Sequence, residues 1–183
     1  MSAGEDLVEA LGSGRCLAAY GDEHVDVDRV GWLDALSVAR DDVGCRWLDW
    51  LGAYEAGRPG ERTLRPVVVA RLWSVERREG VLVRTSLDPD DPRLASATGI
   101  FAGAAWHERE VSEMYGIVFD GHPDPRRLLL PDSFEGHPLR KSSALVARSA
   151  RPWPGSVEPD AGETGRRARR RPTPPGVLPE AGQ

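Results

Sequence analysis

The sequence predicts an α+β fold: a small mixed-sheet domain with helices over residues 1–115, an extended arm over 116–155 and a disordered tail over 156–183. Three observations lead to this prediction. Strand and helix patterns interleave without the regular strand–helix rhythm of a doubly wound fold. Residues 116–141 are dense in Gly, Pro, His and Arg and contain only short apolar pieces. Residues 151–183 contain seven Pro and five Gly, a composition that cannot form a core.

Two helices are predicted in the first part of the chain. Apolar residues recur with helical spacing within residues 1–20 and, more strongly, between Trp32 and Ala39. Asp28 is a suitable N-cap, so the second helix is expected to begin at about Arg29. A third helix, described below with its motif, follows later in the chain.

Alternating or continuous apolar runs predict four strands, of which the last two are the clearest. A charged run at residues 76–80 separates those two and is typical of a hairpin loop. Residues 88–92 are expected to form a loop. The predicted strands span His24–Val27, Cys45–Tyr54, Pro66–Trp73 and Gly80–Ser86.

The composition indicates a soluble globular chain, because 40% of the residues are apolar and 29% are charged. No stretch approaches the ~20 apolar residues that a membrane-spanning helix needs. Residues 1–6 carry two acids and no basic residue, unlike a secretory signal. We therefore expect the chain to stay in the cytosol and to reach a membrane only through partners.

The net charge of −5 is unevenly distributed. Residues 151–183 hold six Arg and four acids, or +2, which leaves −7 on the first 150 residues. Lys141 is the single lysine among 24 basic residues, a bias that indicates G+C-rich codons. The acidic body and the lack of interleaved aromatic residues argue against nucleic-acid binding. A nucleic-acid-binding module would have to use the tail arginines Arg166, Arg167, Arg169, Arg170 and Arg171.

Motifs of self-sufficient enzymes are missing from the sequence. Neither the phosphate-binding pattern G-x-x-x-x-G-K-[ST] nor the nucleophile pattern G-x-S-x-G occurs. Cys16 and Cys45 match no metal spacing, and an iron–sulfur cluster normally takes four thiolates. We therefore expect no flavin, iron or zinc in this chain. A metal hydrolase built from His107, His122, His137 and nearby carboxylates is the enzymatic alternative, which metal analysis would test.

The most informative segment is residues 106–141. A helix is predicted over residues 104–115, and Gly116 is expected to end it. Arg109 and Glu113 are four residues apart and can pair along the helix surface. The helix carries either an ordinary solvated face or a charged docking face for another protein of a complex. That face would comprise Glu108, Arg109, Glu110 and Glu113.

Two acid-Gly-His-Pro boxes follow the helix, at residues 120–123 and 135–138. Gly before His permits a tight backbone path, and Pro after His holds that residue extended. An extended arm cannot satisfy its own backbone and must lie on another surface. We expect the two His side chains to have a structural role, with metal binding as the weaker alternative. Each box is followed by two adjacent basic residues, Arg126-Arg127 and Arg140-Lys141.

This segment resembles the signature of the C-type subunit family of respiratory complex I, the "30-kilodalton" subunit. That family typically reads W-x-E-R-E-x-x-D-M-[FY]-G-I-x-F, then G-H-P-D-L-R-R, then G-H-P-L-R-K-D. The chain departs from the pattern with Glu113 for Asp, Pro125 for Leu, and Ser142-Ser143 after the second basic pair. The matching residues are Trp106, Glu108, Arg109, Glu110, Met114, Tyr115, Gly116, Ile117, Phe119, Gly121, His122, Pro123, Asp124, Arg126, Arg127, Gly136, His137, Pro138, Leu139, Arg140 and Lys141.

The resemblance implies a role in a complex that passes electrons from NADH through FMN and iron–sulfur clusters to quinone, coupled to proton pumping. In that family the 30-kilodalton subunit holds none of these cofactors, which reside in partner subunits. It packs against the D-type subunit, which lines the quinone site, near the B-type and I-type subunits at the cytoplasmic face of the membrane. The helix residues above would form the docking face. The anchors of the arm would be His122, Arg126, Arg127, His137, Arg140 and Lys141.

The same module also occurs in membrane-bound hydrogenases and in complexes that take electrons from donors other than NADH. The sequence does not separate these relatives. Neighbouring genes would, because flavin-binding and NADH-binding subunits favour a full complex I.

Overall fold

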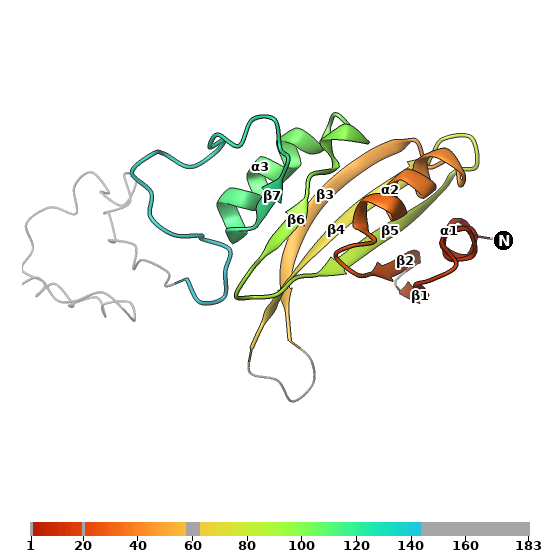
Figure 1. Cartoon of the computed structure of the whole chain (residues 1–183), viewed down its shortest axis with the longest axis horizontal. Coiled ribbons are helices and arrows are strands. Elements are labelled where there is room, and N and C mark those ends of the chain that lie inside the picture. Colours follow the sequence, from red (N-terminus) through yellow and green to blue (C-terminus); the bar gives the residue numbers. More distant parts are fainter. Residues whose placement is uncertain (1, 20, 58–62, 144–183) are drawn as a thin grey trace, which may run out of the picture. The chain divides into compact units, whose positions relative to one another are not determined.

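The computed structural model describes residues 2–19, 21–57 and 63–143 (Figure 1). They form a mixed α+β arrangement, as predicted from the sequence. A five-stranded sheet has the strand order β1-β2-β5-β4-β3, and a two-stranded sheet pairs β6 with β7. The elements are α1 Ala3–Leu11, β1 Arg15–Ala19, β2 Asp22–Val27, α2 Trp32–Asp41, β3 Trp47–Ala56, β4 Arg65–Ser74, β5 Glu79–Ser86, β6 Arg93–Ala95, the 3₁₀ helix η1 Ala97–Gly99, α3 Ala104–Tyr115 and β7 Val118–Asp120.

The larger sheet is antiparallel except at one pairing. Strands β2 and β5 run parallel, with His24 opposite Leu82. Strands β3, β4 and β5 form an antiparallel meander in which Val69 lies opposite both Gly52 and Arg84. The predicted hairpin loop between the last two strands is confirmed, since β4 ends at Ser74 and β5 begins at Glu79.

The core lies on one face of this sheet. In β4 the side chains of Val68, Ala70 and Leu72 are fully buried and, as alternate residues of a strand, point to the same face. Helix α2 buries Trp32 and Leu36 and lies over the sheet in Figure 1. Each fully buried side chain of this size contributes about 1.5–3 kcal/mol to the free energy of unfolding.

The N-terminal region differs from the prediction of one helix over residues 1–20. Helix α1 ends at Leu11, because Gly12 adopts a left-handed conformation with φ 61°. The chain then forms β1, which pairs antiparallel with β2. A five-residue edge strand gives too short a pattern to be recognised from sequence. The start of α2 also differs slightly: Gly31 is the N-cap residue, and the Asp28 carboxylate accepts a hydrogen bond from its N–H at 2.7 Å.

Residues 116–143 belong to the same compact unit as the sheet, which spans Met1–Ser143. The sequence predicted an extended arm here, and within it Val118–Asp120 forms β7, which pairs in parallel with β6. The rest of the predicted arm, residues 144–155, and the predicted disordered tail, 156–183, lie outside the described residues. None of the described helices is long and apolar enough to cross a membrane.

The sheet face opposite the core is partly covered by aromatic rings of the sheet itself. The Trp73 ring lies over Gly80, and the Trp50 ring lies over Gly52. The Arg71 guanidinium stacks 5.1 Å from the centre of the Trp73 ring. Gly80 of β5 therefore leaves room for Trp73 of the neighbouring strand β4, and Gly52 leaves room for Trp50 of the same strand, β3.

We expect Gly80→Ala to destabilise the chain by about 1–3 kcal/mol, the usual cost of overpacking. A Cβ atom at Gly80 would lie 2.5 Å from Trp73 Cε3 and 2.8 Å from the backbone oxygen of Leu72, which cannot move away easily. The measurement is the urea midpoint of unfolding. Gly99→Ala is the matched control, because a Cβ there meets no atom within 4 Å. Equal midpoints for both variants would show that the Trp73 ring is not fixed over Gly80.

Candidate functional site: the arm packed on helix α3

Helix α3 presents one face to the core and the other to the arm. Ala104, Glu108 and Val111 are buried on the core side, at spacings of four and three residues. The prediction of a helix over residues 104–115 is confirmed. The helix ends at Gly116, which has φ 69° as expected for a left-handed C-cap.

Glu108 is fully buried and joins α3 to the segment that follows β6. Its carboxylate accepts hydrogen bonds from the Ser96 hydroxyl at 2.6 Å and from the Ala97 backbone N–H at 2.6 Å. These donors lie at the start of η1, where unsatisfied N–H groups favour a negative charge. Burial raises the pKa of Glu108, while the bonds from Ser96 and Ala97 and the nearby His122 oppose that rise.

Arg109 and Glu113 hold the backbone of the arm. The Arg109 guanidinium donates to the carbonyl oxygens of Arg126 and Arg127, both at 2.7 Å. The Glu113 carboxylate accepts from the next two backbone N–H groups, those of Leu128 at 2.5 Å and Leu129 at 2.8 Å. The sequence suggested that these two side chains pair with each other, whereas each instead binds the arm. One helix turn thus satisfies four backbone polar groups, which belong to three successive peptide groups of an extended segment.

His122 fastens the first acid-Gly-His-Pro box to the same helix. Its Nδ1 accepts a hydrogen bond from the Asp124 N–H at 3.0 Å, so the ring proton resides on Nε2. Nε2 then donates to the carbonyl oxygen of Ala105 at 3.0 Å. Both ring nitrogens are therefore used within the chain, which fits the structural role expected for this residue.

The second box caps the C-terminus of α3. The last carbonyl oxygens of the helix, those of Glu113, Met114 and Tyr115, accept from His137 Nδ1, the Leu139 N–H and Arg140 Nε at 2.8, 3.2 and 2.5 Å. These carbonyls have no partner inside the helix, and a positive charge beside them is favourable.

Gly116 is needed beside this cap for two reasons. Its φ of 69° disfavours side chains, and a Cβ atom there would lie 2.5 Å from His137 Nε2.

The remaining basic residues of the arm differ in their partners. Arg127 Nη1 donates to the carbonyl oxygens of Pro131 at 2.9 Å and Phe134 at 3.0 Å, which curls the arm around its guanidinium. Arg126 pairs with Asp124 at 2.7 Å while its side chain remains 82% exposed. This pairing lowers the pKa of Asp124. The backbone N–H of Lys141 donates to Glu55 in β3, and Lys141 itself is exposed.

The residues of the predicted docking face thus do not all lie on one exposed surface. Glu108 and Glu113 are buried and bonded within the chain, so their carboxylates are not part of an exposed face that a partner could contact directly. Their neighbour Glu110 is exposed, as are Arg126 and Lys141 of the arm. Whether these exposed residues contact partners stays a prediction.

Sequence reasoning missed a set of exposed apolar side chains on α3, β7 and the arm. Trp106 is 63% exposed, Leu129 58% and Leu139 52%. Only the run Leu128-Leu129-Leu130 within a Gly- and Pro-rich arm could have signalled them. Within residues 104–143, the set comprises Trp106, Val118, Leu129, Phe134 and Leu139. We call it the apolar set of the arm.

Among the described residues, no three His, Cys, Asp or Glu side chains lie together in a way that could hold a metal ion. His122 Nε2 lies 3.9 Å from a Glu108 carboxylate oxygen, but the described residues do not gather this pair with a third possible ligand, as the metal-hydrolase alternative requires.

Comparison with known proteins places these features in a family. The family model described as respiratory-chain NADH dehydrogenase, 30 Kd subunit, matches residues 25–149. The chain belongs to this family. The C-type subunit of NADH-quinone oxidoreductase from Brucella abortus (strain 2308) is 39% identical over 128 residues, and its counterpart from Brucella ovis shows the same identity over the same length. The match covers 70% of this chain and 62% of each relative, so the chain spans less than two thirds of their length.

Two solved structures share the fold of this family member. The trypsin-resistant fragment (1-134) of Nqo5 superposes with a TM-score of 0.56 at 27% identity, covering 64% of this chain and 92% of the fragment. A chain of the membrane-bound sulfane sulfur reductase, an archaeal respiratory membrane complex, superposes with a TM-score of 0.51 at 19% identity, covering 64% of this chain and 68% of that one. The second likeness concerns the fold alone.

We expect Glu113→Gln to loosen the arm without unfolding the domain. The substitution keeps the shape but removes the charge that accepts two backbone N–H groups, each bond being worth about 1.5–3 kcal/mol. Amide exchange at Leu128 and Leu129, followed by NMR, should become roughly ten- to a hundredfold faster. Glu110→Gln, on the exposed side of the same helix, is the control. Unchanged exchange at both amides would contradict a role of the Glu113 carboxylate in holding the arm.

Glu108 should make stability depend on pH. Its pKa in the folded chain is raised above the ordinary value of 4.5, so the folded state holds the proton more tightly than the unfolded chain. The protonated Glu108 carboxyl therefore stabilises the folded chain below pH 4.5, and this stabilisation is lost as pH rises through the raised pKa. Urea unfolding between pH 4 and pH 7 should therefore show wild type losing stability relative to Glu108→Gln. A difference that grows in favour of wild type would mean that the bonds from Ser96 and Ala97 outweigh burial.

Proposed function

We propose that the chain is a cofactor-free peripheral-arm subunit of a proton-translocating NADH:quinone oxidoreductase, with a structural and assembly role beside the D-type subunit that lines the quinone site. Membership of the 30 Kd subunit family and the 39% identity to C-type subunits of NADH-quinone oxidoreductase support this proposal. In it, the chain contacts the D-type, B-type and I-type subunits at the cytoplasmic face of the cell membrane and reaches the membrane only through them. FMN and the iron–sulfur clusters belong to partner subunits.

The observation that carries the proposal is the fixed shape of the arm. Arg109 and Glu113 hold successive peptide groups, and His137 and Arg140 cap α3, so the arm up to Ser143 follows the helix instead of remaining free. A segment already held in one conformation loses little further entropy on binding. The arm therefore offers partners a preformed surface.

The apolar set of the arm also supports a partner contact on this surface. Trp106, Leu129 and Leu139 are each more than half exposed to water, although they belong to well-bonded elements. Contiguous exposed apolar patches rimmed by polar residues mark protein interaction sites. Glu110, Arg126 and Lys141 supply exposed charges on the same helix and arm. We assign this surface to the contact with the D-type subunit.

The wild-type complex would also identify the electron donor. Recovery of flavin- and NADH-binding subunits together with this chain fits the proposed oxidoreductase. Recovery of hydrogenase subunits would instead assign the chain to the corresponding relative.

We expect Leu129→Asp and Leu139→Asp to weaken assembly while leaving the fold intact. A carboxylate in place of a leucine that packs against the partner removes one of the few contacts that dominate the binding free energy. Such a loss amounts to about 2 kcal/mol or more, which is roughly a thirtyfold loss of affinity. The measurement is recovery of the D-type subunit in a pull-down, with thermal melting of the isolated variant. Val75→Asp is the control, since Val75 is 71% exposed in the β4–β5 turn, away from the arm. Unaltered recovery with both arm variants would remove the arm from the interface.

A further inference from the structure

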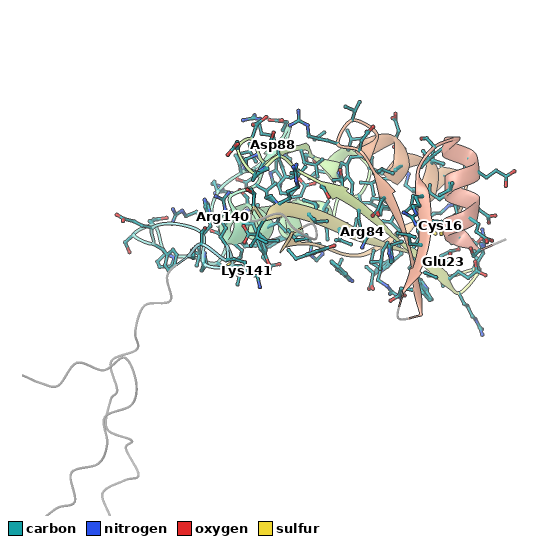
Figure 2. All side chains as sticks on the ribbon, turned by 90° about the horizontal axis from the view of Figure 1, so that it is seen from below. Cys16, Glu23, Arg84, Asp88, Arg140 and Lys141 are labelled. Atoms are coloured by element: carbon teal, nitrogen blue, oxygen red, sulfur yellow. The ribbon has the colours of Figure 1, made fainter. Side chains whose placement is uncertain are left out.

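A hollow of about 410 Å³ lies on the sheet, outside the site described above. It crosses four strands, β2, β5, β4 and β3. Arg84, one of its lining residues, lies in the middle of the sheet in Figure 2, well apart from Arg140 and Lys141 of the arm. We call it the sheet hollow. Its lining consists of Asp22, His24, Trp50, Gly52, Ala53, Tyr54, Val69, Leu82 and Arg84.

Aromatic rings border the sheet hollow. Trp50 and Tyr54 are both 39% exposed and stand on the same face of β3, because they are four residues apart in a strand. Gly52 between them has no side chain, and the Trp50 ring lies over it, so this ring forms one wall of the sheet hollow. Val69, opposite Gly52 on β4, is 5% exposed and forms part of an apolar floor. A flat apolar group fits a space of this kind.

The charged groups around the sheet hollow are already paired. Arg84 donates to both carboxylate oxygens of Asp26, at 2.7 and 2.8 Å. Arg71 bridges Asp22 at 3.2 Å and Asp49 at 2.8 Å. A charged occupant would have to compete with one of these pairs. Electrostatic complementarity therefore favours an uncharged occupant.

His24 is the polar group in the sheet hollow that lacks a partner. It is 7% exposed and forms no hydrogen bond with any residue that the structure describes. Burial lowers its pKa, as does the positive charge of Arg84, while Asp26 acts in the opposite direction. The neutral ring offers one N–H donor and one nitrogen acceptor. The ring nitrogens of His24 are not among the fully buried atoms without a partner, so a group that enters the sheet hollow can reach and bond them.

We propose that the sheet hollow receives an uncharged aromatic side chain, a tyrosine or tryptophan of a partner subunit, whose hydroxyl or indole N–H bonds to His24. The proposal rests on the proposed function, which supplies the partner. Tyrosine and tryptophan are enriched among the residues that dominate interfaces, and they combine a flat apolar body with one hydrogen-bonding group. That combination matches the borders, the floor and the unpaired histidine.

The first test replaces Tyr54 by the photoreactive residue p-benzoylphenylalanine in the full chain within the assembled complex. Irradiation should join this position to a partner subunit, at or next to a Tyr or Trp identified by mass spectrometry. A cross-link to a second copy of this chain, to a segment without an aromatic residue, or to no protein would overturn the proposal. Co-purification of the wild-type chain is scored in parallel. If wild type co-purifies and the cross-link fails, the sheet hollow proposal fails alone; if wild type does not co-purify, the proposed function fails too, and with it the partner.

A second test separates binding from folding. His24→Phe keeps a ring of similar size but removes the hydrogen-bonding nitrogens. We expect the isolated variant to melt at or above the wild-type temperature, because the ring keeps its size and no hydrogen bond within the described residues is lost. Its dissociation from the complex should be roughly tenfold faster. Trp47→Ala is the control, since Trp47 is an exposed residue of β3 that does not line the sheet hollow. A lower melting temperature with unchanged dissociation would make His24 a residue of the domain's own architecture and overturn the assignment.

Discussion

The arrangement of the C-terminal part depends on one constraint: an extended segment must find partners for its backbone N–H and C=O groups. Helix α3 supplies them from two side chains one turn apart, with the Arg109 guanidinium taking carbonyls and the Glu113 carboxylate taking N–H groups. In return, His137 and Arg140 of the arm take the carbonyls that α3 leaves open at its end. Helix and arm thus each satisfy backbone groups of the other, which explains why so many residues of the family signature are polar.

Inside the domain, the buried Glu108 carboxylate likewise finds its hydrogen-bond donors on a neighbouring segment. A fully buried carboxylate is costly unless it is hydrogen-bonded, and here Ser96 and Ala97 provide the bonds at the start of η1. This contact fixes the segment between β6 and α3. Because β6 pairs with β7 just after the helix, Glu108 also sets the path on which the chain enters the arm.

Sequence reasoning predicted the elements with strong local signals and missed those without them. Helix α3 was predictable with both ends, because Gly116 gives an unambiguous stop. Strand β1 was missed, since five residues after two glycines show no clear alternation. For the site, the motif identified the right residues but not their partners. The sequence showed that Arg109 and Glu113 could pair, because spacing on one helix is visible in sequence, whereas bonds to backbone groups 15–18 residues away are not. The exposure of Trp106 and Leu129 likewise depends on how the arm is laid down.

The parallel pairing of β2 with β5 has a consequence for the order in which the domain folds. The Arg84–Asp26 bond across this pairing joins residues 58 positions apart, whereas β3, β4 and β5 are linked in sequence as neighbouring hairpins. Closing a long loop costs more entropy than closing a hairpin, and contacts between distant residues slow folding. The meander of β3 to β5 is therefore expected to form first, with the N-terminal strands joining its edge last. During synthesis, the N-terminal segment must wait for β5 to leave the ribosome, and its apolar residues stay uncovered over that interval.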